Sequence, residues 1–368
     1  DEVLSVVLSL WTSMAVAITD SIIERSEPIL VTGANGFIGS KVVEILLADG
    51  FTNLRCLVRS AAYMTNLKRV LEVCQLGTVE VYEGNLLSRD VCRKVVEGVS
   101  VVYHLAAGRG EKSYPNAYMN SVVTTRNLLE AIGENGRAKR IVCVSSFTVY
   151  STARLKWGEL LDETCSLEDQ PHLRGEAYCY AKVRQEEIFQ EYVRKYQIPY
   201  VIVRPGVVYG PGNKGITGRV GLSGFGVFLH LGGSNRIPLT YVDNCSQAIV
   251  LAGIKEGVDG EIFNIVDDDL PTSSQFLKLY KKHVRGFRSI YVPHYLSYLL
   301  CYMWEKYSAW SEGQLPPVFN RKKWFAYWNG NRYSNQKIKA LLGWKQKVPF
   351  AEASRRYFES EKQQGVNR

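Results

Sequence analysis

The sequence predicts an α/β fold in which helices cover both faces of a parallel sheet. Short apolar runs alternate with helical patterns from residue 29 to residue 203. A glycine-rich turn separates the first apolar run from the first helical pattern. After Pro205 the composition changes, because glycine becomes frequent up to Gly233. Such alternation is typical of parallel strands joined by covering helices.

The predicted elements follow one another in a regular order. Apolar runs suited to buried strands occupy residues 29–31, 54–58, 79–82, 99–105, 141–144 and 200–203. Helical patterns lie between them at residues 38–48, 64–75, 88–97, 116–134 and 176–196. Beyond Pro205 the glycines predict loops, and an acidic turn at 267–269 leads into short helices. We therefore expect a doubly wound sheet and a smaller second region.

The overall composition is that of a globular protein. The chain has 368 residues, of which 46% are hydrophobic and 22% charged. These values exclude a disordered chain, a collagen-like fibre and a small disulfide scaffold. The eight cysteines include no Cys-x-x-Cys pair, which argues against a zinc site and against a secreted disulfide framework. We expect reduced thiols, a cytoplasmic location and no metal site.

Residues 1–27 precede the first strand and are expected to form a helical extension. Asp1 and Glu2 stand where a signal peptide would carry basic residues. Packing of the helix on its own domain is favoured over pairing in a homodimer. Apolar residues recur there at alternating spacings of four and three: Leu4, Leu8, Trp11, Ala15, Ile18 and Ile22.

A membrane-spanning helix is not expected anywhere in the chain, because no apolar run reaches the ~18 residues that crossing requires. Aromatic residues nevertheless gather from Tyr291 to Trp328, beside the basic run 321–323. They are expected to line a substrate-binding region. The alternative is peripheral contact with a membrane, since aromatic and basic residues also favour that interface.

The turn after the first strand reads Thr-Gly-Ala-Asn-Gly-Phe-Ile-Gly over residues 32–39. Glycines at this spacing allow a tight turn, close approach to a pyrophosphate and packing of helix on strand. The helix N-terminus then offers free N–H groups and a partial positive charge. This pattern predicts a Rossmann-like dinucleotide site. Its members are Gly33, Asn35, Gly36, Phe37, Ile38 and Gly39.

The end of the second strand indicates which cofactor binds. An acid there would bind the ribose 2′-hydroxyl of NAD, whereas an arginine accommodates the 2′-phosphate of NADP. The stretch ends in Arg59 and Ser60 and contains no acid. NADP is therefore favoured over NAD.

Tyr178 and Lys182 are four residues apart and so share one face of a helix. A tyrosine in water has a pKa near about 10 and is a poor base at neutral pH. A neighbouring ammonium and the positive ring of an oxidised nicotinamide both favour the phenolate. Ser145 and Ser146 close the fifth strand, where a hydroxyl points into the ligand crevice of such sheets. Together these residues predict proton transfer at a substrate oxygen.

With these motifs in order, the chain resembles the extended short-chain dehydrogenase/reductases, the group of NAD(P)-dependent sugar epimerases and dehydratases. The resemblance covers about residues 28 to 360. The matching segments are residues 32–39, 104–107, Asn120 with 127–131, 145–150, 178–182, 204–212, 241–244 and 342–344.

The resemblance implies a role for each matching residue. Ser146 would orient the substrate, Tyr178 would be the general acid/base, and Lys182 would bind the cofactor ribose. The cofactor cleft would be lined further by Asn85, Leu86, Leu105, Ala106, Ala107, Pro205 and Val208. The implied nucleotide-binding domain spans residues 28–205 with about 237–256, and the substrate lobe about 206–236 and 257–360.

Two departures from the family pattern bear on the chemistry. The adenine-contacting turn has Asn85 where relatives often have aspartate, so hydrogen bonds survive there and the charge does not. The acid pair that dehydratases place after the catalytic hydroxyl is replaced by Phe147 and Thr148. Elimination of water needs such an acid or base, so the sequence argues against dehydration. His104 ends an apolar strand and is expected to be packed, not to bind a ligand.

The charge distribution favours an anionic partner beside the C-terminal region. Residues 278–368 contain 18 basic and 5 acidic residues, whereas the complete chain has a net charge of +9. No nucleic-acid motif is present.

Taken together, the motifs predict hydride transfer at an alcohol or ketone carbon, most readily of a nucleotide sugar, with epimerisation or net reduction as the outcome. Candidate diphosphate ligands are Arg219, Arg236 and Arg332.

Two other functions remain open. The chain could resemble the 3β-hydroxysteroid dehydrogenase and dihydroflavonol reductase branches, which act on apolar substrates. Arg59 and the aromatic C-terminal region favour that reading. A non-catalytic NADP-binding sensor or scaffold is the other alternative. The complete set of Ser146, Tyr178 and Lys182 argues against it, because a sensor has no need of a phenolate.

Overall fold

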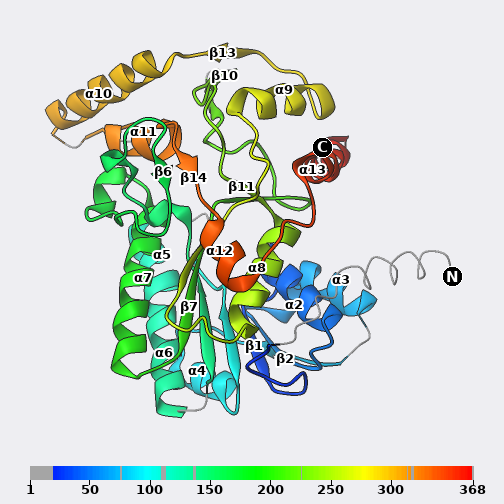
Figure 1. Ribbon diagram of the computed structural model, residues 1–368. Helices are drawn as coiled ribbons and strands as arrows, with labels where there is room; N and C mark the ends of the chain where they lie inside the picture. Colours follow the sequence, from blue (N-terminus) through cyan, green and yellow to red (C-terminus); the bar gives the residue numbers. More distant parts are fainter. Residues whose placement is uncertain are drawn as a thin grey trace.

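The computed structural model describes residues 20–74, 77–108, 113–135, 138–224, 226–312, 314–315 and 319–366. Its centre is a seven-stranded parallel sheet in the order β12-β7-β5-β4-β1-β2-β3 (Figure 1). Six of these strands are the ones predicted from the sequence, and β12 was not predicted. The strands are β1 (Ile29–Thr32), β2 (Asn53–Val58), β3 (Thr78–Glu83), β4 (Val101–His104), β5 (Arg140–Val144), β7 (Tyr200–Pro205) and β12 (Ile262–Ile265).

Helices cover both faces of this sheet, so the predicted doubly wound fold is confirmed. The helices are α2 (Gly39–Ala48), α3 (Thr65–Val73), α4 (Arg89–Val96), α5 (Tyr114–Tyr118), α6 (Thr124–Asn135), α7 (Ala177–Lys195) and α8 (Val242–Ile254). Successive strand residues point to opposite faces. Val31 therefore packs in the core with α2 and α8, whereas its neighbour Leu30 packs in the core with α4, α6 and α7.

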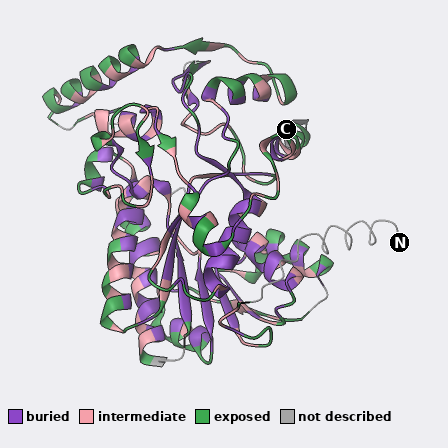
Figure 2. Ribbon diagram, viewed as in Figure 1, coloured by how far each residue is buried: buried purple, intermediate pink, exposed green. Residues whose placement is uncertain are grey.

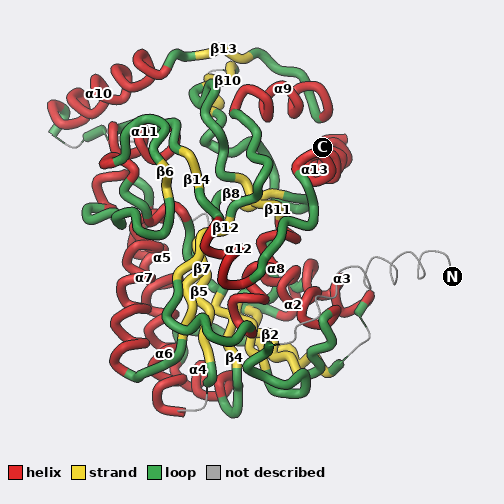
Figure 3. Tube along the Cα trace, viewed as in Figure 1, coloured by secondary structure: helices red, strands yellow, loops and turns green. Residues whose placement is uncertain are grey.

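A second region lies over the carboxyl ends of the strands and is largely buried where it meets them (Figures 1 and 2). Its short strands form small separate sheets, β13-β10-β9, β11-β8 and β14-β6 (Figure 3). The strands are β6 (Leu160–Leu161), β8 (Val207–Tyr209), β9 (Gly221–Gly224), β10 (Val227–His230), β11 (Leu239–Tyr241), β13 (Ser289–Tyr291) and β14 (Arg332–Tyr333). The helices are α9 (Ser273–His283), α10 (His294–Trp310), α11 (Arg321–Trp328), α12 (Gln336–Leu342) and α13 (Phe350–Val366).

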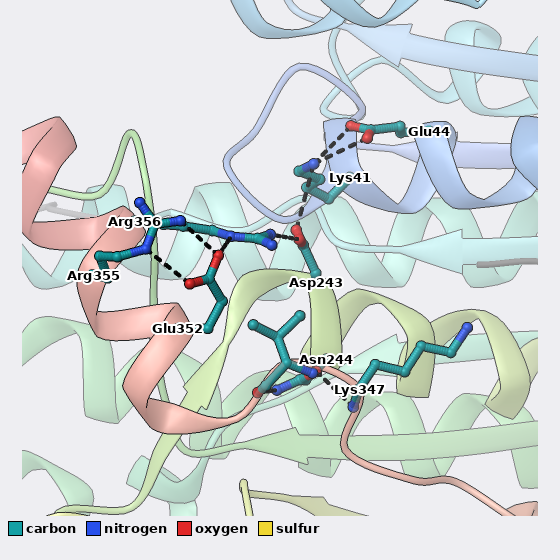
Figure 4. A network of polar contacts seen from close by, with 9 residues as sticks. Lys41, Glu44, Asp243, Asn244, Lys347, Glu352, Arg355 and Arg356 are labelled. Atoms are coloured by element: carbon teal, nitrogen blue, oxygen red, sulfur yellow. Dashed lines mark hydrogen bonds and ion pairs between the residues drawn. The ribbon is translucent and has the colours of Figure 1, made fainter. Parts of the chain in front are cut away.

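An ionic network anchors α13 to the sheet domain (Figure 4). Asp243, in the first turn of α8, lies 3.4 Å from Lys41 of α2 and 3.9 Å from Arg356 of α13. Glu44 accepts a further contact from Lys41 at 2.9 Å. Burial disfavours the charge of Lys41, but the Asp243 and Glu44 carboxylates outweigh it and raise the pKa of Lys41. These ion pairs thus connect α2, α8 and α13.

The expected helical extension differs from the structure where the two can be compared. Ser21 forms a β-bridge with Lys255, and the N–H of Ile22 donates to the oxygen of Ile254 at 2.9 Å. Residues 20–27 therefore contain no helix, because their backbone pairs with the end of α8 instead. The other apolar positions of that spacing, from Leu4 to Ile18, lie outside the described residues.

Candidate active site

A cavity of about 590 Å³ lies at the carboxyl ends of the central strands. Every residue that the sequence assigned to the cofactor lines it, as does Ser146. The contributing segments are the turn after β1, the ends of β2 and β3, the residues after β4 and β5, the face of α7, and the residues around β8. A crevice of this size, at the edge where such sheets bind ligands, can hold a dinucleotide.

The glycine turn fits a pyrophosphate because side chains would fill the space it leaves. Gly33 has a φ of +69° and already lies close to Ala106, so a side chain there would be strained and crowded. A Cβ on Gly39 would lie 2.1 Å from the oxygen of Gly33. The same contact lets the first turn of α2 pack directly on the end of β1. The residues present therefore fit a bound nicotinamide dinucleotide.

Asn35 also has a structural role beside the cavity. Its Oδ1 accepts hydrogen bonds from the N–H groups of Asn66 and Leu67, at 3.1 and 3.0 Å, in the first turn of α3. Its Nδ2 donates to the oxygen of Tyr63 at 2.7 Å. Asn35 thus caps a helix distant in sequence and fixes the wall of the cavity, while it also lines that cavity.

The wall after β2 is the region expected to choose between NAD and NADP. Arg59 is exposed there, and Ser60 follows it. Glu83, at the end of the neighbouring β3, accepts a hydrogen bond from the N–H of Ala61 at 3.1 Å. Tyr63 also lines this end, with 80% of its surface exposed, and was not among the predicted cofactor residues.

The two serines after β5 have different partners. Ser145 donates to Oε2 of Glu186 at 2.5 Å and is buried. The Oγ of Ser146 accepts from the N–H of Thr148 at 3.2 Å, and the residue is only half-buried. Because Ser145 has already committed its proton to Glu186, Ser146 is the hydroxyl suited to donate to a ligand.

Lys182 is largely buried and lines the cavity. Its Nζ donates to the oxygen of Val144 at 2.8 Å and to Oε1 of Gln185 at 2.9 Å. An ammonium has three N–H donors, so one donor remains for a ligand. Tyr178, one helical turn earlier, is half-buried and lines the same cavity.

A chain of hydrogen bonds continues inward from Gln185. Its Nε2 donates to Thr125 Oγ1 at 2.8 Å, and that hydroxyl donates to the oxygen of Ser121 at 2.6 Å. His104 Nε2 lies 2.8 Å from the same Oγ1 and must be the donor, because the hydroxyl proton is already used. His104 Nδ1 then accepts from Thr32 Oγ1 at 2.9 Å. The ring bridges β1, β4 and α6.

Burial, together with the nearby Lys182 charge, lowers the pKa of His104 to about 3. The imidazole is therefore neutral at physiological pH, as the single proton on Nε2 requires. This packed, fully bonded ring agrees with the expectation that His104 does not bind a ligand.

A buried ion pair supports the other side of α7. Arg204, from β7, pairs with Glu186 of α7, and its NH1 donates to the hydroxyl of Tyr150 at 2.9 Å. The Tyr150 hydroxyl in turn donates to Asn264 Oδ1 at 2.7 Å. This network joins α7, β7, β12 and the segment after β5 around one guanidinium.

The structure does not bring the three predicted diphosphate ligands together, and none of them lines the cavity. Arg236 donates to the oxygen of Leu270 at 2.7 Å, and Arg332 donates to the oxygen of Gly158 at 2.8 Å. Both guanidinium groups are thus turned toward backbone carbonyls. Arg219 lies 5.5 Å from the ring centre of Tyr327, whose hydroxyl contacts the residue before α7.

Asn120 and Thr124 also line the cavity but were not assigned to it from the sequence. The helix predicted over 116–134 is interrupted by a π-helical turn at Met119–Val123. Such turns occur frequently at functional sites because they redirect side chains. Asn120 is one of the residues on which the resemblance to the family was based, and that match could have predicted its place in the cavity.

A sequence model of the NAD dependent epimerase/dehydratase family matches residues 29–266, well over half of the chain. The chain belongs to this family. The resemblance drawn from the motifs is thus confirmed, and the protein is an NAD(P)-dependent enzyme of the extended short-chain dehydrogenase type.

Individual relatives within the family are distant. The dTDP-D-glucose 4,6-dehydratase of Dictyostelium discoideum is 26% identical over 259 residues, which are 66% of this chain and 58% of that protein. The N-acetyl-alpha-D-glucosaminyl-diphospho-ditrans,octacis-undecaprenol 4-epimerase of Escherichia coli O157:H7 is 26% identical over 281 residues, 74% of this chain and 78% of that protein.

Solved structures of the family share the fold. A UDP-glucuronic acid 4-epimerase from Bacillus cereus in complex with NAD superposes with a TM-score of 0.68 at 20% identity. The superposition covers 92% of this chain and 99% of that one. The family description and this complex both name NAD, and neither distinguishes NAD from NADP for this chain.

Proposed function

We propose that the protein catalyses nicotinamide-dependent hydride transfer at a secondary alcohol or ketone carbon of a nucleotide sugar, as an epimerase or a reductase. One observation carries the proposal: a single cavity contains the glycine turn and the set of Ser146, Tyr178 and Lys182. A bound nicotinamide would supply or accept the hydride. The side chains of this protein would handle the proton and hold the reactants in position.

Each of the three side chains has a distinct role in this proposal. Tyr178 moves the proton to or from the substrate oxygen. Ser146 donates a hydrogen bond to the same oxygen and orients it. Lys182, already bonded to Val144 and Gln185, uses its remaining N–H to hold the cofactor ribose.

The substrate class rests on the relatives. The two compared sugar enzymes are named for dTDP-D-glucose and for a sugar diphosphate attached to undecaprenol. A diphosphate needs a cation, and among the predicted arginines we assign this role to Arg219, which stacks on Tyr327 beside α7. Dehydration is not proposed, because Phe147 and Thr148 follow Ser146 and supply no acid.

The domain division follows from the same proposal. Residues 28–205, with about 237–256, would bind the cofactor, and about 206–236 with 257–360 would enclose the substrate. We also propose NADP as the preferred cofactor, because Arg59 is exposed at the wall where a 2′-phosphate would lie.

The decisive experiment incubates the purified chain with NAD or NADP and panels of nucleotide sugars and of hydrophobic ketones. Conversion is followed by mass spectrometry and by nicotinamide absorbance. We expect turnover of a nucleotide sugar. Turnover restricted to hydrophobic ketones would replace the proposal with a reductase on apolar substrates. Cofactor binding without any turnover would favour the sensor alternative.

A further inference from the structure

Helix α10 turns its large apolar side chains toward solvent. Its buried positions are the small residues Ser297, Cys301 and Ser308. This reverses the usual pattern, in which the apolar stripe of a surface helix faces the core. In Figure 2 the helix is largely exposed at the edge of the second region. Its exposed apolar residues are Tyr295, Leu296, Leu299, Leu300, Tyr302, Met303, Tyr307 and Trp310.

These residues form one continuous face. At 3.6 residues per turn, positions 295, 299, 303, 306 and 310 form one stripe of the helix. Leu296, Leu300 and Tyr307 lie beside that stripe. The two ends are the most open, since Tyr295 and Trp310 each keep 77% of their surface exposed. We call these residues of α10 the α10 face.

Most charged residues on and beside α10 are cationic, and the exposed Glu312 follows the helix. The one acid of α10, Glu305, is paired with Arg321 at 3.0 Å. Lys306 lies within the stripe, with its ammonium 5.6 Å from the ring centre of Tyr302. Arg285 and Arg288 are exposed just before β13. Two copies meeting through this face would bring like charges together, whereas an anionic surface would complement them.

The α10 face is also supported rigidly from behind. Trp324 of α11 donates through its indole N–H to Ser297 Oγ at 2.8 Å, and its ring lies 5.2 Å from that of Tyr298. Helix α11 is joined to the start of α7, because the Tyr327 hydroxyl donates to Glu176 at 2.9 Å. The face is thus presented by packed elements and is not a frayed end.

We propose that the α10 face binds the surface of an anionic membrane, with α10 lying in the plane of the interface. Its leucines and methionine would enter the acyl boundary, its tyrosines and Trp310 would lie at the headgroups, and its cations would contact lipid phosphates. None of the described helices is long and apolar enough to cross a membrane, which agrees with a helix lying flat. This inference goes beyond the proposed function and does not depend on it.

The test uses the full chain and vesicles of phosphatidylcholine, with or without phosphatidylglycerol. Binding is measured by co-sedimentation and by the shift of tryptophan emission. We expect binding to the anionic vesicles, and about a ten-fold weaker partition for the Leu299→Gln/Met303→Gln variant. The double variant Arg285→Gln/Arg288→Gln should lose about five-fold per charge removed. The emission shift should be largely lost in Trp310→Phe.

The matched control is Val73→Gln/Leu341→Gln, which replaces exposed apolar residues of α3 and α12, away from the α10 face. It should bind vesicles like the parent chain. All these positions are exposed, so circular dichroism and Tm should stay unchanged. Absent binding, equal binding to neutral vesicles, or equal loss in the control overturns the proposal. So does a lipid-free dimer that dissociates in Leu299→Gln/Met303→Gln, since the face would then join two copies.

Discussion

The ammonium of Lys182 donates to the backbone oxygen of Val144, 2.8 Å away. This bond ties the catalytic helix to the last residue of a central strand, directly before the two serines. The bond therefore helps to fix the helix relative to the strand end. The positions of Tyr178 and Ser146 relative to each other depend on that attachment.

Tyr178→Phe should strongly lower turnover while cofactor binding persists. The phenyl ring fills the same space, but it cannot carry a proton. General acid–base groups contribute about 10²–10⁴-fold to rate, so kcat should fall within that range. Turnover assays and cofactor fluorescence titration measure the two quantities. A kcat close to that of the parent chain would remove Tyr178 from the mechanism.

The two neighbouring serines should respond in opposite ways to replacement by alanine. Ser145→Ala leaves Glu186 without a charge-assisted hydrogen bond, so the free energy of unfolding should fall by about 1.5–3 kcal/mol. Its kcat should change little. Ser146→Ala should lower kcat with little change in Tm. Each variant serves as the control for the other, and the reverse pattern would exchange their roles.

Gln185→Leu should disturb Lys182 without touching the substrate. The variant removes the acceptor for the ammonium and the donor to Thr125. We expect a higher KM for the cofactor and about a ten-fold lower kcat. Gln190→Leu, on the same helix but half-exposed, is the matched control. A change in Tm with an unaltered KM and kcat would show that Gln185 is only structural.

Arg59→Ala should weaken NADP binding selectively. The loss of a charged hydrogen bond to the 2′-phosphate corresponds to about 1.5–3 kcal/mol, and NAD binding should hardly change. Titration of both cofactors against both chains measures the difference. A parent chain that binds NAD clearly better than NADP would refute the assignment of Arg59.

His104 should make stability depend on acid pH. Burial holds its folded-state pKa at about 3, below the usual value of about 6.5. Between these two values the unfolded chain binds a proton that the folded chain does not. Stability is therefore lost as pH falls from 6.5 toward 3, by at most about 1.4 kcal/mol per pH unit.

The measurement is urea unfolding across that pH range. His104→Gln should be less stable than the parent chain at pH 7 but should lose less stability on acidification. His172→Gln, at an exposed position, should follow the parent chain. Parallel curves for the parent chain and His104→Gln would contradict the low pKa.

The sheet domain was predictable because its signals are local. Apolar runs such as 141–144 and the glycine turn each specify their own conformation. Strand β12 was missed because its meaning depends on pairing with β7, some sixty residues earlier, and not on its own pattern. The strands after Pro205 are short, and several of them lie in a glycine-rich segment, so the sequence there predicts loops. Their partners, such as β10 and β13, are far apart in the chain.

The site divides in the same way. Residues in contiguous motifs, such as Tyr178 and Lys182, could be predicted, because a separation of four residues in a helix already places both side chains on one face. Gln185 and Thr125 were not found, since their role arises only where α6 and α7 meet. The sequence also could not predict where the side chains of Arg236 and Arg332 point. In the folded chain their guanidinium groups donate to backbone carbonyl oxygens of other segments.

The buried pair of Arg204 and Glu186 constrains how this sequence can evolve. Removing one partner leaves an unpaired charge in the core, which lowers the free energy of unfolding by about 3–5 kcal/mol. That is a large part of the stability of an ordinary domain. Selection should therefore remove single substitutions at either position. Homologues that lack the pair should have replaced both residues. Homologous sequences should show these two positions varying in concert, with position 145 following them.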